Sequence, residues 1–560
     1  MQLDTLLAEA FSGSSLFAGL DPQRITQLQP RTGSLREGEV LFQQGDAGDD
    51  SYVLLRGVLG LHTGPLNAST PFFRKVVPGE LVGEYGPICG EPRSASAVAL
   101  TPVDYLQLDR GQLLGLLQDQ ATLQARVLAS LAEAASLGRD PQRAPLDAVL
   151  IHDASPGSPL TRTALEQLAE PLQRLARSAG QGQGARLERL GVGEEQRLHA
   201  LLADATRSGE LTVVLSDDPA LLSRRNQLLI DRLLILGDGQ ATSLSLPETL
   251  DENALLVRLW PLEQRTPSSR PWANQRRYAQ VLNLQPDRPQ HLERLARAAL
   301  RRQNVLVLGG GGSRGFAHIG ALRAMEELGL ADIDMVMGVS IGALVASLAA
   351  FEHPAQEIFA NLERVIIKAR PYGLTLPRDS LFTLRNSRRE LQRFFGSTRI
   401  QDSWLPLRCF SANLSSKRLH AWSQGDIPTA VIASMSVPGI FPPVEDGQGQ
   451  LHVDGGILNN LPVCEARRES DGRIIAISLG SLPQPGPGSR ERPSLGRTII
   501  DSMLCASHAE TQAQERLADV MLHPDIGRFP FLEWKRYREI HDEGYSHAHQ
   551  VLREVLAPRP

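Results

Sequence analysis

The sequence predicts a multidomain α/β protein with an N-terminal β-roll, a middle parallel α/β domain and a C-terminal α/β domain. Three observations carry this expectation. Short strand-like runs with glycine turns fill the first part of the chain, strands and helices alternate in the middle, and two strand–glycine turn–helix units follow near residues 310 and 340. The chain has 560 residues, 42% of them hydrophobic and 22% charged. Such a chain is long enough for about three or four domains.

The first expected domain covers residues 1–140. Its Leu35–Leu59 stretch consists of short alternating strands separated by glycine turns, which is typical of a small β-roll or barrel. Helices are expected on either side, near Leu6–Leu28 and Arg110–Leu137. Together these features closely resemble the cyclic nucleotide-binding domain.

In that family a short cassette holds the cyclic phosphate, and the resemblance places it on residues 83–95. It implies that Arg93 pairs with the phosphate and that Glu84 accepts a hydrogen bond from the ribose 2′-hydroxyl. Gly83 and Ser94 flank these two residues in the expected site.

The cassette departs from the family at Gly86-Pro87, where Ala-Leu is usual. Proline has no amide hydrogen, so one possible phosphate donor is missing. Two alternatives therefore stay open: a domain that binds cAMP or cGMP, and a roll that has lost its ligand and serves as an interaction surface.

The middle domain is expected over residues 146–300, where strands and helices alternate as in a parallel α/β fold. This region has no P-loop lysine and no catalytic motif, so its role stays open. The expected strands are Ala148–His152, Leu211–Leu215 and Arg232–Leu236, and the expected helices are Ala164–Ala176, Glu195–Asp204 and Ala220–Leu229. Linkers are expected at Gly138–Pro145 and Gln264–Arg276, and a proline-rich loop at Pro483–Pro493.

The third expected domain covers residues 301–482, with an extension over 483–560 that packs on it. It contains the sequence Gly338-Val339-Ser340-Ile341-Gly342 between a short apolar run and a helix-forming segment. A serine in G-x-S-x-G at a strand-to-helix turn projects from a strained backbone, and glycines on both sides avoid Cβ clashes. Ser340 is therefore the predicted nucleophile, with Gly338 and Gly342 shaping its turn.

A second glycine-rich turn lies between the strand-like run Asn304–Leu308 and the helix-like run Phe316–Met325. The first amides of a helix have no partners within it, and the positive helix end suits an oxyanion. The expected oxyanion hole consists of Gly310, Gly311, Gly312, Ser313, Arg314 and Gly315.

The same turn also fits the dinucleotide fingerprint G-x-G-x-x-G, which makes a nicotinamide or flavin enzyme an alternative. Such a site needs an acid at the carboxyl end of the second strand to hold the ribose. Asp332 and Asp334 lie near the required distance but precede the core of that strand, whose carboxyl end leads to Ser340 instead. The dinucleotide alternative is accordingly disfavoured.

The candidate base is Asp454, which ends an apolar run and precedes two glycines. A partly desolvated aspartate on such a turn is able to accept the serine proton directly. The alternatives are an ordinary Asp-Gly turn and a triad based on His318 or His452.

The segment from Asn304 to Ser481 resembles the patatin-like phospholipases, which share its GGGxRG loop, its G-x-S-x-G turn and its D-G-G turn in this order. Ala433–Pro443 and Asp454–Pro462 match the family as well. Ser313 stands where the family usually has Ala, which keeps the backbone donor. The three-domain arrangement resembles neuropathy target esterase and its bacterial relatives, of which the larger animal members add a membrane span and further nucleotide domains.

The resemblance implies a Ser–Asp dyad that hydrolyses acyl esters of phospholipids or lysophospholipids, with Ser340 as nucleophile, Asp454 as base and no catalytic cofactor. Since no membrane span is expected, membrane contact must be peripheral. Phe529–Tyr537 and Pro371–Pro377 are candidate surfaces, although apolar stretches of this kind more often belong to the core. The alternative outside the enzymes is a catalytically silent binding or scaffold protein that responds to cyclic nucleotide. A third hypothesis is that the nucleotide domain regulates hydrolysis. The sequence does not determine whether the nucleotide would activate or inhibit it.

The remaining composition favours a cytoplasmic protein, with the inner membrane surface as a place of contact. A net charge of −5 argues against nucleic acid as a partner. The chain has no apolar run of about 18 residues, and its start lacks the features of a signal peptide. Four scattered cysteines, Cys89, Cys409, Cys464 and Cys505, indicate free thiols and no metal site.

Overall fold

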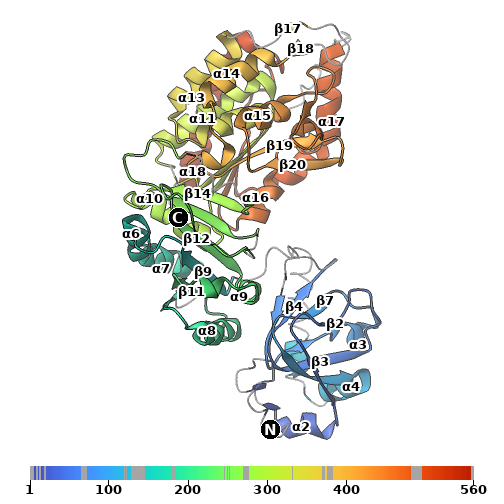
Figure 1. Cartoon of the computed structure of the whole chain (residues 1–560). Helices are drawn as coiled ribbons and strands as arrows, with labels where there is room; N and C mark the ends of the chain where they lie inside the picture. The colour runs from blue at the N-terminus through green and yellow to red at the C-terminus, as the bar shows by residue number, and fades with distance from the viewer. Residues whose placement is uncertain are drawn as a thin grey trace. The chain divides into compact units, whose positions relative to one another are not determined.

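The computed structural model of the chain is drawn in Figure 1. It describes residues 6–7, 10–11, 14, 16–17, 20–64, 72, 74–118, 120, 123–127, 146–178, 184–244, 246–248, 250, 252–268, 276–330, 332–368, 373–374, 382–480 and 495–556. The chain divides into two compact units. The first holds Met1–Pro156, Gln173–Ile235 and Ser245–Ala254, and the second holds Gly157–Leu172, Leu236–Leu244 and Leu255–Pro560. The expected linker Gly138–Pro145 and the expected loop Pro483–Pro493 lie outside the described residues.

The N-terminal part of the first unit is the expected β-roll, built from two antiparallel four-stranded sheets. The first has the order β1 (Arg31–Leu35), β8 (Val103–Asp109), β3 (Asp50–Arg56) and β6 (Leu81–Val82). The second has the order β2 (Val40–Phe42), β7 (Ser96–Ala99), β4 (Leu59–His62) and β5 (Arg74–Val76). The helices α2 (Pro22–Gln27), α3 (Tyr85–Cys89) and α4 (Arg110–Gln118) accompany them.

The middle region forms the expected parallel sheet. Its strand order is β10 (Arg186–Leu190), β11 (Thr212–Ser216), β9 (Ala148–Asp153), β12 (Arg232–Asp238), β13 (Leu255–Leu259) and β14 (Gln280–Leu284). The helices between these strands are α6 (Pro159–Gln167), α7 (Ala169–Ser178), α8 (Glu195–Ser208) and α9 (Arg224–Leu229). The sequence patterns anticipated β9, β11 and β12 but missed β10, β13 and β14, whose runs contain arginine, glutamate, asparagine or glutamine.

The C-terminal region contains an eight-stranded sheet whose central strands are parallel. Its order is β21 (Val444–Glu445), β22 (Leu451–Asp454), β19 (Leu407–Asn413), β16 (Met335–Val339), β15 (Val305–Leu308), β23 (Ile474–Ile477) and β24 (Val520–Leu522), and β20 (Arg418–Trp422) also pairs with β19. The glycine-rich turns follow β15 and β16, so both turns lie at the same edge of this sheet.

Helices cover both faces of this sheet, which explains why its strands read as continuous apolar runs. Leu306 and Leu308 of β15 pack in one core with residues of α11 (Phe316–Glu327) and α12 (Ile341–Ala349). Val305 and Val307 face the other way and pack with residues of α16 (Val463–Glu469). In Figure 1, α11 and α13 (Ala355–Leu362) lie on one side of the sheet and α17 (Leu495–Glu515) lies on the other.

The C-terminal helix α18 (Tyr537–Leu556) packs closely on α11. A Cβ atom on Gly320 of α11 would lie 2.0 Å from the carbonyl oxygen of His541, and one on Gly544 of α18 would lie 2.3 Å from that of Ala317. Both glycines therefore let the two backbones touch. The segment after residue 494 is part of the packing of the catalytic region.

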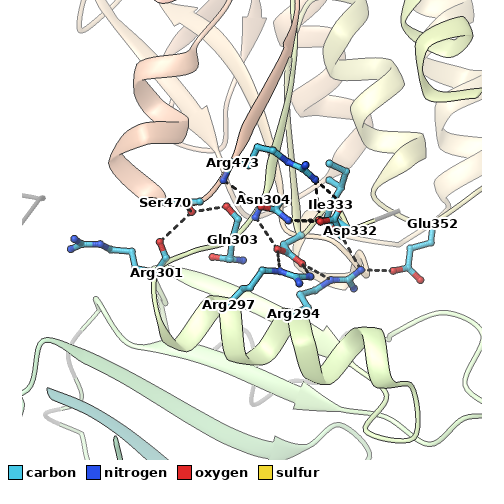
Figure 2. Close-up of polar contacts among 12 residues, drawn as sticks. Arg294, Arg297, Arg301, Gln303, Asn304, Asp332, Ile333, Glu352, Ser470 and Arg473 are labelled. Atoms are coloured by element: carbon cyan, nitrogen blue, oxygen red, sulfur yellow. Dashed lines mark hydrogen bonds and ion pairs between the residues drawn. The ribbon is translucent and has the colours of Figure 1, made fainter. Parts of the chain in front are cut away.

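A polar cluster connects α10 (Pro289–Ala299) to the amino ends of β15 and β16 (Figure 2). Arg297 donates to both oxygens of Asp334 at 2.6 and 2.7 Å, and the Asn304 amide donates to the same carboxylate at 2.8 Å. Arg294 lies 3.7 Å from Asp334 and 2.8 Å from Glu352, and Figure 2 shows its contact with Glu352. The Asp334 side chain is fully buried and is held by two arginines.

This cluster removes the basis of the dinucleotide alternative. Asp334 directly precedes β16, and Asp332 pairs with Arg473, which directly precedes β23. The two acids thus lie at the amino ends of the strands, whereas the glycine-rich turns lie at the carboxyl ends. Neither acid is placed to hold a ribose at those turns.

Candidate active site

Ser340 occupies a strained turn between β16 and α12. Its backbone has φ of 54° and ψ of −124°, a positive φ that side-chain-bearing residues rarely adopt. A Cβ atom on Gly338 would lie 2.3 Å from the carbonyl oxygen of Gly342, and one on Gly342 would lie 2.2 Å from that of Leu308. Each flanking glycine is therefore required by a close backbone contact, as in a nucleophile elbow.

Asp454 reaches the same place through the sheet. In the parallel pair of β16 and β19, Val339 lies opposite Phe410, and in the antiparallel pair of β19 and β22, Ser411 lies opposite Asp454. Phe410 and Ser411 are consecutive in β19, so Ser340, which follows Val339, and Asp454 lie on either side of this strand at the same level. They are far apart in the sequence.

The Asp454 carboxylate is buried, with an exposed fraction of 1%. Burial raises its pKa to about 6, against the smaller lowering effects of hydrogen bonds from the Ser340 side chain and the Gly456 amide. Oδ1 accepts from the Gly456 amide at 2.8 Å. Oδ2 has no well-aligned hydrogen bond within the described residues, so the contact with the Ser340 hydroxyl is loose. Catalytic hydrogen bonds often tighten only when substrate binds.

The two histidines considered as alternatives are used elsewhere. His318 Nε2 bonds the Gly309 carbonyl at 2.8 Å, and burial lowers its pKa to about 4, so the ring is neutral. His452 Nδ1 bonds the Ser411 hydroxyl at 2.9 Å, and its Nε2 faces Asp446 at 3.2 Å. Neither ring bonds Ser340, and the geometry favours the dyad over a triad.

The glycine-rich loop leaves fewer amides free than the sequence pattern predicted. The Gly310 amide donates to the Asn460 carbonyl at 3.2 Å, that of Ser313 to Phe531 at 2.8 Å, and that of Arg314 to Gly311 at 3.2 Å. Within the described part of the chain, the amides of Gly311 and Gly312 have no acceptor. Within the glycine-rich loop, the candidate oxyanion donors are therefore these two amides. Gly315 instead lets the loop contact the nucleophile turn, because its Cβ would lie 2.3 Å from the Ile341 side chain.

The C-terminal segment supports this loop. Arg314 Nε donates to the Phe529 carbonyl at 2.9 Å, and the Ser313 hydroxyl donates to the Pro530 carbonyl at 3.2 Å. Phe529 is fully buried, while Leu532 is 45% exposed. The start of the Phe529–Tyr537 stretch therefore belongs to the core and not to a membrane-binding surface. Of the other candidate surface, only residues 373–374 are described.

Two residues that the sequence motifs did not single out hold the site together. Asn460 Nδ2 donates to the Gly310 carbonyl at 3.1 Å, which ties the turn after Asp454 to the oxyanion loop. The Ser434 hydroxyl accepts from the Ser340 amide at 2.8 Å. Both lie in segments that match the phospholipase family, and that spacing was the available signal. The Ile341 amide, which directly follows the nucleophile, is a further candidate oxyanion donor.

The residues of the expected nucleotide site in the β-roll lie around Arg93. Its guanidinium lies over the Phe42 ring, 4.5 Å from the centroid, and Nη1 donates to the Gly83 carbonyl at 2.6 Å. Arg93 forms no ion pair with a carboxylate of the described residues, and its buried Nε has no hydrogen-bond partner there. Glu84 is buried, which raises its pKa, and Ser94 is exposed. A buried guanidinium without a carboxylate fits an anionic ligand.

The departure at Gly86 has a packing reason. A Cβ atom there would lie 2.4 Å from the Gly48 carbonyl oxygen, so the usual alanine would not fit against this loop. The loop and the cassette are also joined by backbone bonds of 2.9 Å, from Gly45 to Arg93 and from Arg93 to Asp46. The cassette is closely packed against the loop before β3.

The fold and the site define a class of proteins: three-layered α/β proteins in which a serine on a strand-to-helix turn lies beside a buried aspartate. Comparison with known families finds two matches in this chain. Residues 306–467 match the family of patatin-like phospholipases, and residues 32–120 match the cyclic nucleotide-binding domain. The chain thus carries a patatin-like phospholipase domain together with an N-terminal cyclic nucleotide-binding domain.

Similar proteins include lysophospholipase nte1 of Neurospora crassa, 30% identical over 299 residues, which are 48% of this chain and 20% of that protein. Another is patatin-like phospholipase domain-containing protein 6 of Mus musculus, 30% identical over 311 residues, 49% of this chain and 22% of that protein. The chain therefore spans about a fifth of the length of these relatives. The regulatory domain of Toxoplasma gondii PKA with cAMP is 21% identical over 23% of this chain and 50% of that one, with a TM-score of 0.20.

No helix in the described ranges is both long enough and apolar enough to cross a lipid bilayer.

Proposed function

We propose that this protein is a carboxylic ester hydrolase that cleaves acyl esters of phospholipids or lysophospholipids with a Ser340–Asp454 dyad. The observation that carries the proposal is the buried Asp454 carboxylate beside the Ser340 hydroxyl, which projects from a strained turn. The patatin-like match and the relatives named lysophospholipase support the lipid ester class.

The proposed chemistry starts with ionised Asp454, which accepts the proton of the Ser340 hydroxyl as its oxygen attacks the ester carbonyl. The amides of Gly311 and Gly312 stabilise the negative oxygen of the tetrahedral intermediate. Protonated Asp454 then gives its proton to the departing alcohol, which leaves an acyl ester on Ser340. Water attacks this ester with Asp454 again acting as base, and the fatty acid is released.

The dyad is tested by hydrolysis of lysophosphatidylcholine, a diacyl phosphatidylcholine and a short-chain nitrophenyl ester. Ser340→Ala and Asp454→Asn should each abolish turnover. Ser347→Ala is the matched control, because Ser347 is a buried serine of α12 whose hydroxyl, within the described part of the chain, bonds only the Leu344 carbonyl at 2.7 Å. Turnover that survives in Ser340→Ala would refute the proposal, and a wild type inactive on all three esters would favour the silent scaffold.

Phospholipids and lysophospholipids are components of membranes. The proposal therefore includes peripheral contact with the cytoplasmic face of a membrane. Sedimentation with vesicles that contain the preferred phospholipid checks this part. Protein that stays in the supernatant under conditions of full hydrolysis would show that the enzyme acts on dispersed lipid.

We further infer that the β-roll binds cAMP or cGMP and that the ligand acts on hydrolysis. The buried Arg93 guanidinium, whose Nε has no hydrogen-bond partner within the described residues, supports an anionic ligand, and Glu84 near it suits a ribose hydroxyl. Calorimetric titration should give binding that Arg93→Gln abolishes, while Arg36→Gln, a change at an exposed arginine of the same roll, leaves it intact. Absence of heat with both nucleotides would support a roll without ligand.

Coupling between the two domains has its own test. By linkage, a nucleotide that changes lipid affinity must have its own affinity changed by the same factor when a lipid analogue is bound. Equal nucleotide affinity with and without the analogue would refute coupling through binding.

A further inference from the structure

We propose that Ser434 is the positioning residue of the nucleophile, so that α15 (Ile427–Met435) sets the relative placement of the two members of the dyad. This inference rests on the proposed function, because it assigns Ser434 a role through Ser340.

The Ser434 hydroxyl makes two hydrogen bonds of opposite kind. It accepts from the Ser340 amide at 2.8 Å and donates to the Phe410 carbonyl at 2.6 Å, and the side chain is fully buried. A hydroxyl has one proton. Because the hydroxyl donates that proton in its hydrogen bond to the Phe410 carbonyl, it uses an oxygen lone pair to accept from the Ser340 amide.

The Ser340 amide needs such an acceptor. Ser340 is the N-cap residue of α12, so its N–H has no acceptor within the helix. The amide is buried in a turn with a positive φ, and a strained conformation persists only where its surroundings hold it. The Ser434 hydroxyl supplies the acceptor for the Ser340 amide and so holds the strained turn.

The base is held by the same end of α15. The Asp454 amide donates to the Ser436 carbonyl at 2.9 Å, two residues after Ser434. Phe410, which receives the Ser434 proton, directly precedes the residue that pairs with Asp454 across β19 and β22. One short segment thus bonds the backbone of the nucleophile and the backbone of the base.

This segment is well anchored. The Ser436 hydroxyl donates to the Ile432 carbonyl at 2.8 Å, which fixes the last turn of α15. At the other end, the Asp426 side chain caps the helix by accepting from the Thr429 amide at 2.8 Å. α15 packs against α12, β19 and β22, the three elements that carry or neighbour the dyad.

The decisive experiment compares Ser434→Thr with Ser434→Val in the full chain. The two side chains have similar volume and differ in the hydroxyl, so any strain from the added methyl group is common to both. The threonine variant should be active, and the valine variant should lose about 100-fold in kcat with little change in KM, because displacing a reacting group by about 1 Å has an effect of that size. Ser434→Ala should behave like the valine variant.

Two further readouts separate positioning from general damage. Labelling of Ser340 by a fluorophosphonate should slow in parallel with kcat, and the acidic limb of the pH profile should move little, because burial, the main cause of the raised pKa of Asp454, is unchanged. Ser347→Ala controls for the loss of a buried hydroxyl nearby. Equal kcat in the threonine and valine variants, or a valine variant within about twofold of wild type, would overturn the role of Ser434. If Ser340→Ala is inactive in the same assay, that result leaves the proposed function standing.

Discussion

Asp454→Asn should inactivate the enzyme and stabilise its fold, and the two effects have one physical cause. Burial raises the pKa of Asp454 to about 6 from an ordinary value of 3.8. At pH 8 the folded protein therefore holds a carboxylate in a place that disfavours charge. Asparagine removes the charge, keeps the shape, and still offers an oxygen to the Gly456 amide that Asp454 now bonds at 2.8 Å.

The size of the gain follows from the pKa difference. One pKa unit corresponds to about 1.4 kcal/mol, so a carboxyl raised from 3.8 to about 6 destabilises the ionised fold by about 3 kcal/mol at pH 8. The folded state binds the proton more tightly than the unfolded state. Wild-type stability therefore falls as the pH rises from about 4 to about 6 and is level above that range.

The stability of the variant lacks this fall, so the gain depends on pH. It should amount to about 0.5 kcal/mol at pH 4, about 1.5 kcal/mol at pH 5 and about 3 kcal/mol at pH 8. Urea unfolding of the two proteins at these pH values measures it. Asp525→Asn is the control, because that side chain is 89% exposed and should give no gain that depends on pH. A gain for Asp454→Asn that stays constant from pH 5 to pH 8 would refute the assignment of a buried, ionised base.

The same pKa fixes the pH dependence of wild-type hydrolysis. Since the base must be ionised, kcat/KM should fall tenfold per pH unit below about 6 and reach about a tenth of its plateau at pH 5. The midpoint should hardly move with temperature, because carboxyl ionisation has a small enthalpy. A midpoint that drops clearly on warming would point to an imidazole, and His318 and His452 would have to be reconsidered.

Three further changes have expected outcomes of their own. Gly312→Ala places a Cβ atom 2.3 Å from a carbonyl oxygen of the C-terminal segment and displaces an oxyanion donor, so kcat should fall by about 100-fold or more with a smaller change in KM. Arg258→Met removes the ion pair that Arg258 forms with buried Asp402 and should lower the free energy of unfolding by about 3–5 kcal/mol, which Arg258→Met with Asp402→Leu should largely restore. Gly320→Val should separate α18 from α11 and make the C-terminal segment cleavable in limited proteolysis, where an intact segment would contradict the packing.

The class of each domain could be predicted because its evidence is local. The glycines around Ser340 and in the oxyanion loop stand together as short sequence motifs, although most of the close approaches that require them are to residues distant in the sequence, such as Phe531 for Gly312. The β-roll was likewise predicted correctly from alternating strands and glycine turns.

What the sequence could not supply depends on distant partners. β13 and β14 were missed because Arg258 and Asn283 interrupt their apolar pattern, although both side chains are fully buried. Asn283 Nδ2 donates to the Gln401 carbonyl at 3.0 Å, a partner more than a hundred residues away. The Ser313 amide was counted as an oxyanion donor for the same reason, since its acceptor, the Phe531 carbonyl, lies near the end of the chain.

These distant partners also connect the middle sheet to the catalytic turn. Arg258 of β13 pairs with Asp402 at 3.1 Å and donates to the Gln401 carbonyl. The Gln401 side chain accepts from the Gly425 amide at 2.9 Å, directly before the cap of α15. The far end of α15 carries Ser434.

A continuous set of hydrogen bonds therefore runs from β13 through α15 to the Ser340 amide. A static set of contacts explains rigidity, whereas transmission of a signal would require an element with two alternative arrangements. The bonds at the two ends of this set are buried and the bond at Gly425 is partly buried, and each joins a donor to an acceptor. The strands β13 and β14 thus hold the start of α15, the helix whose other end carries the Ser434 hydroxyl that bonds the Ser340 amide.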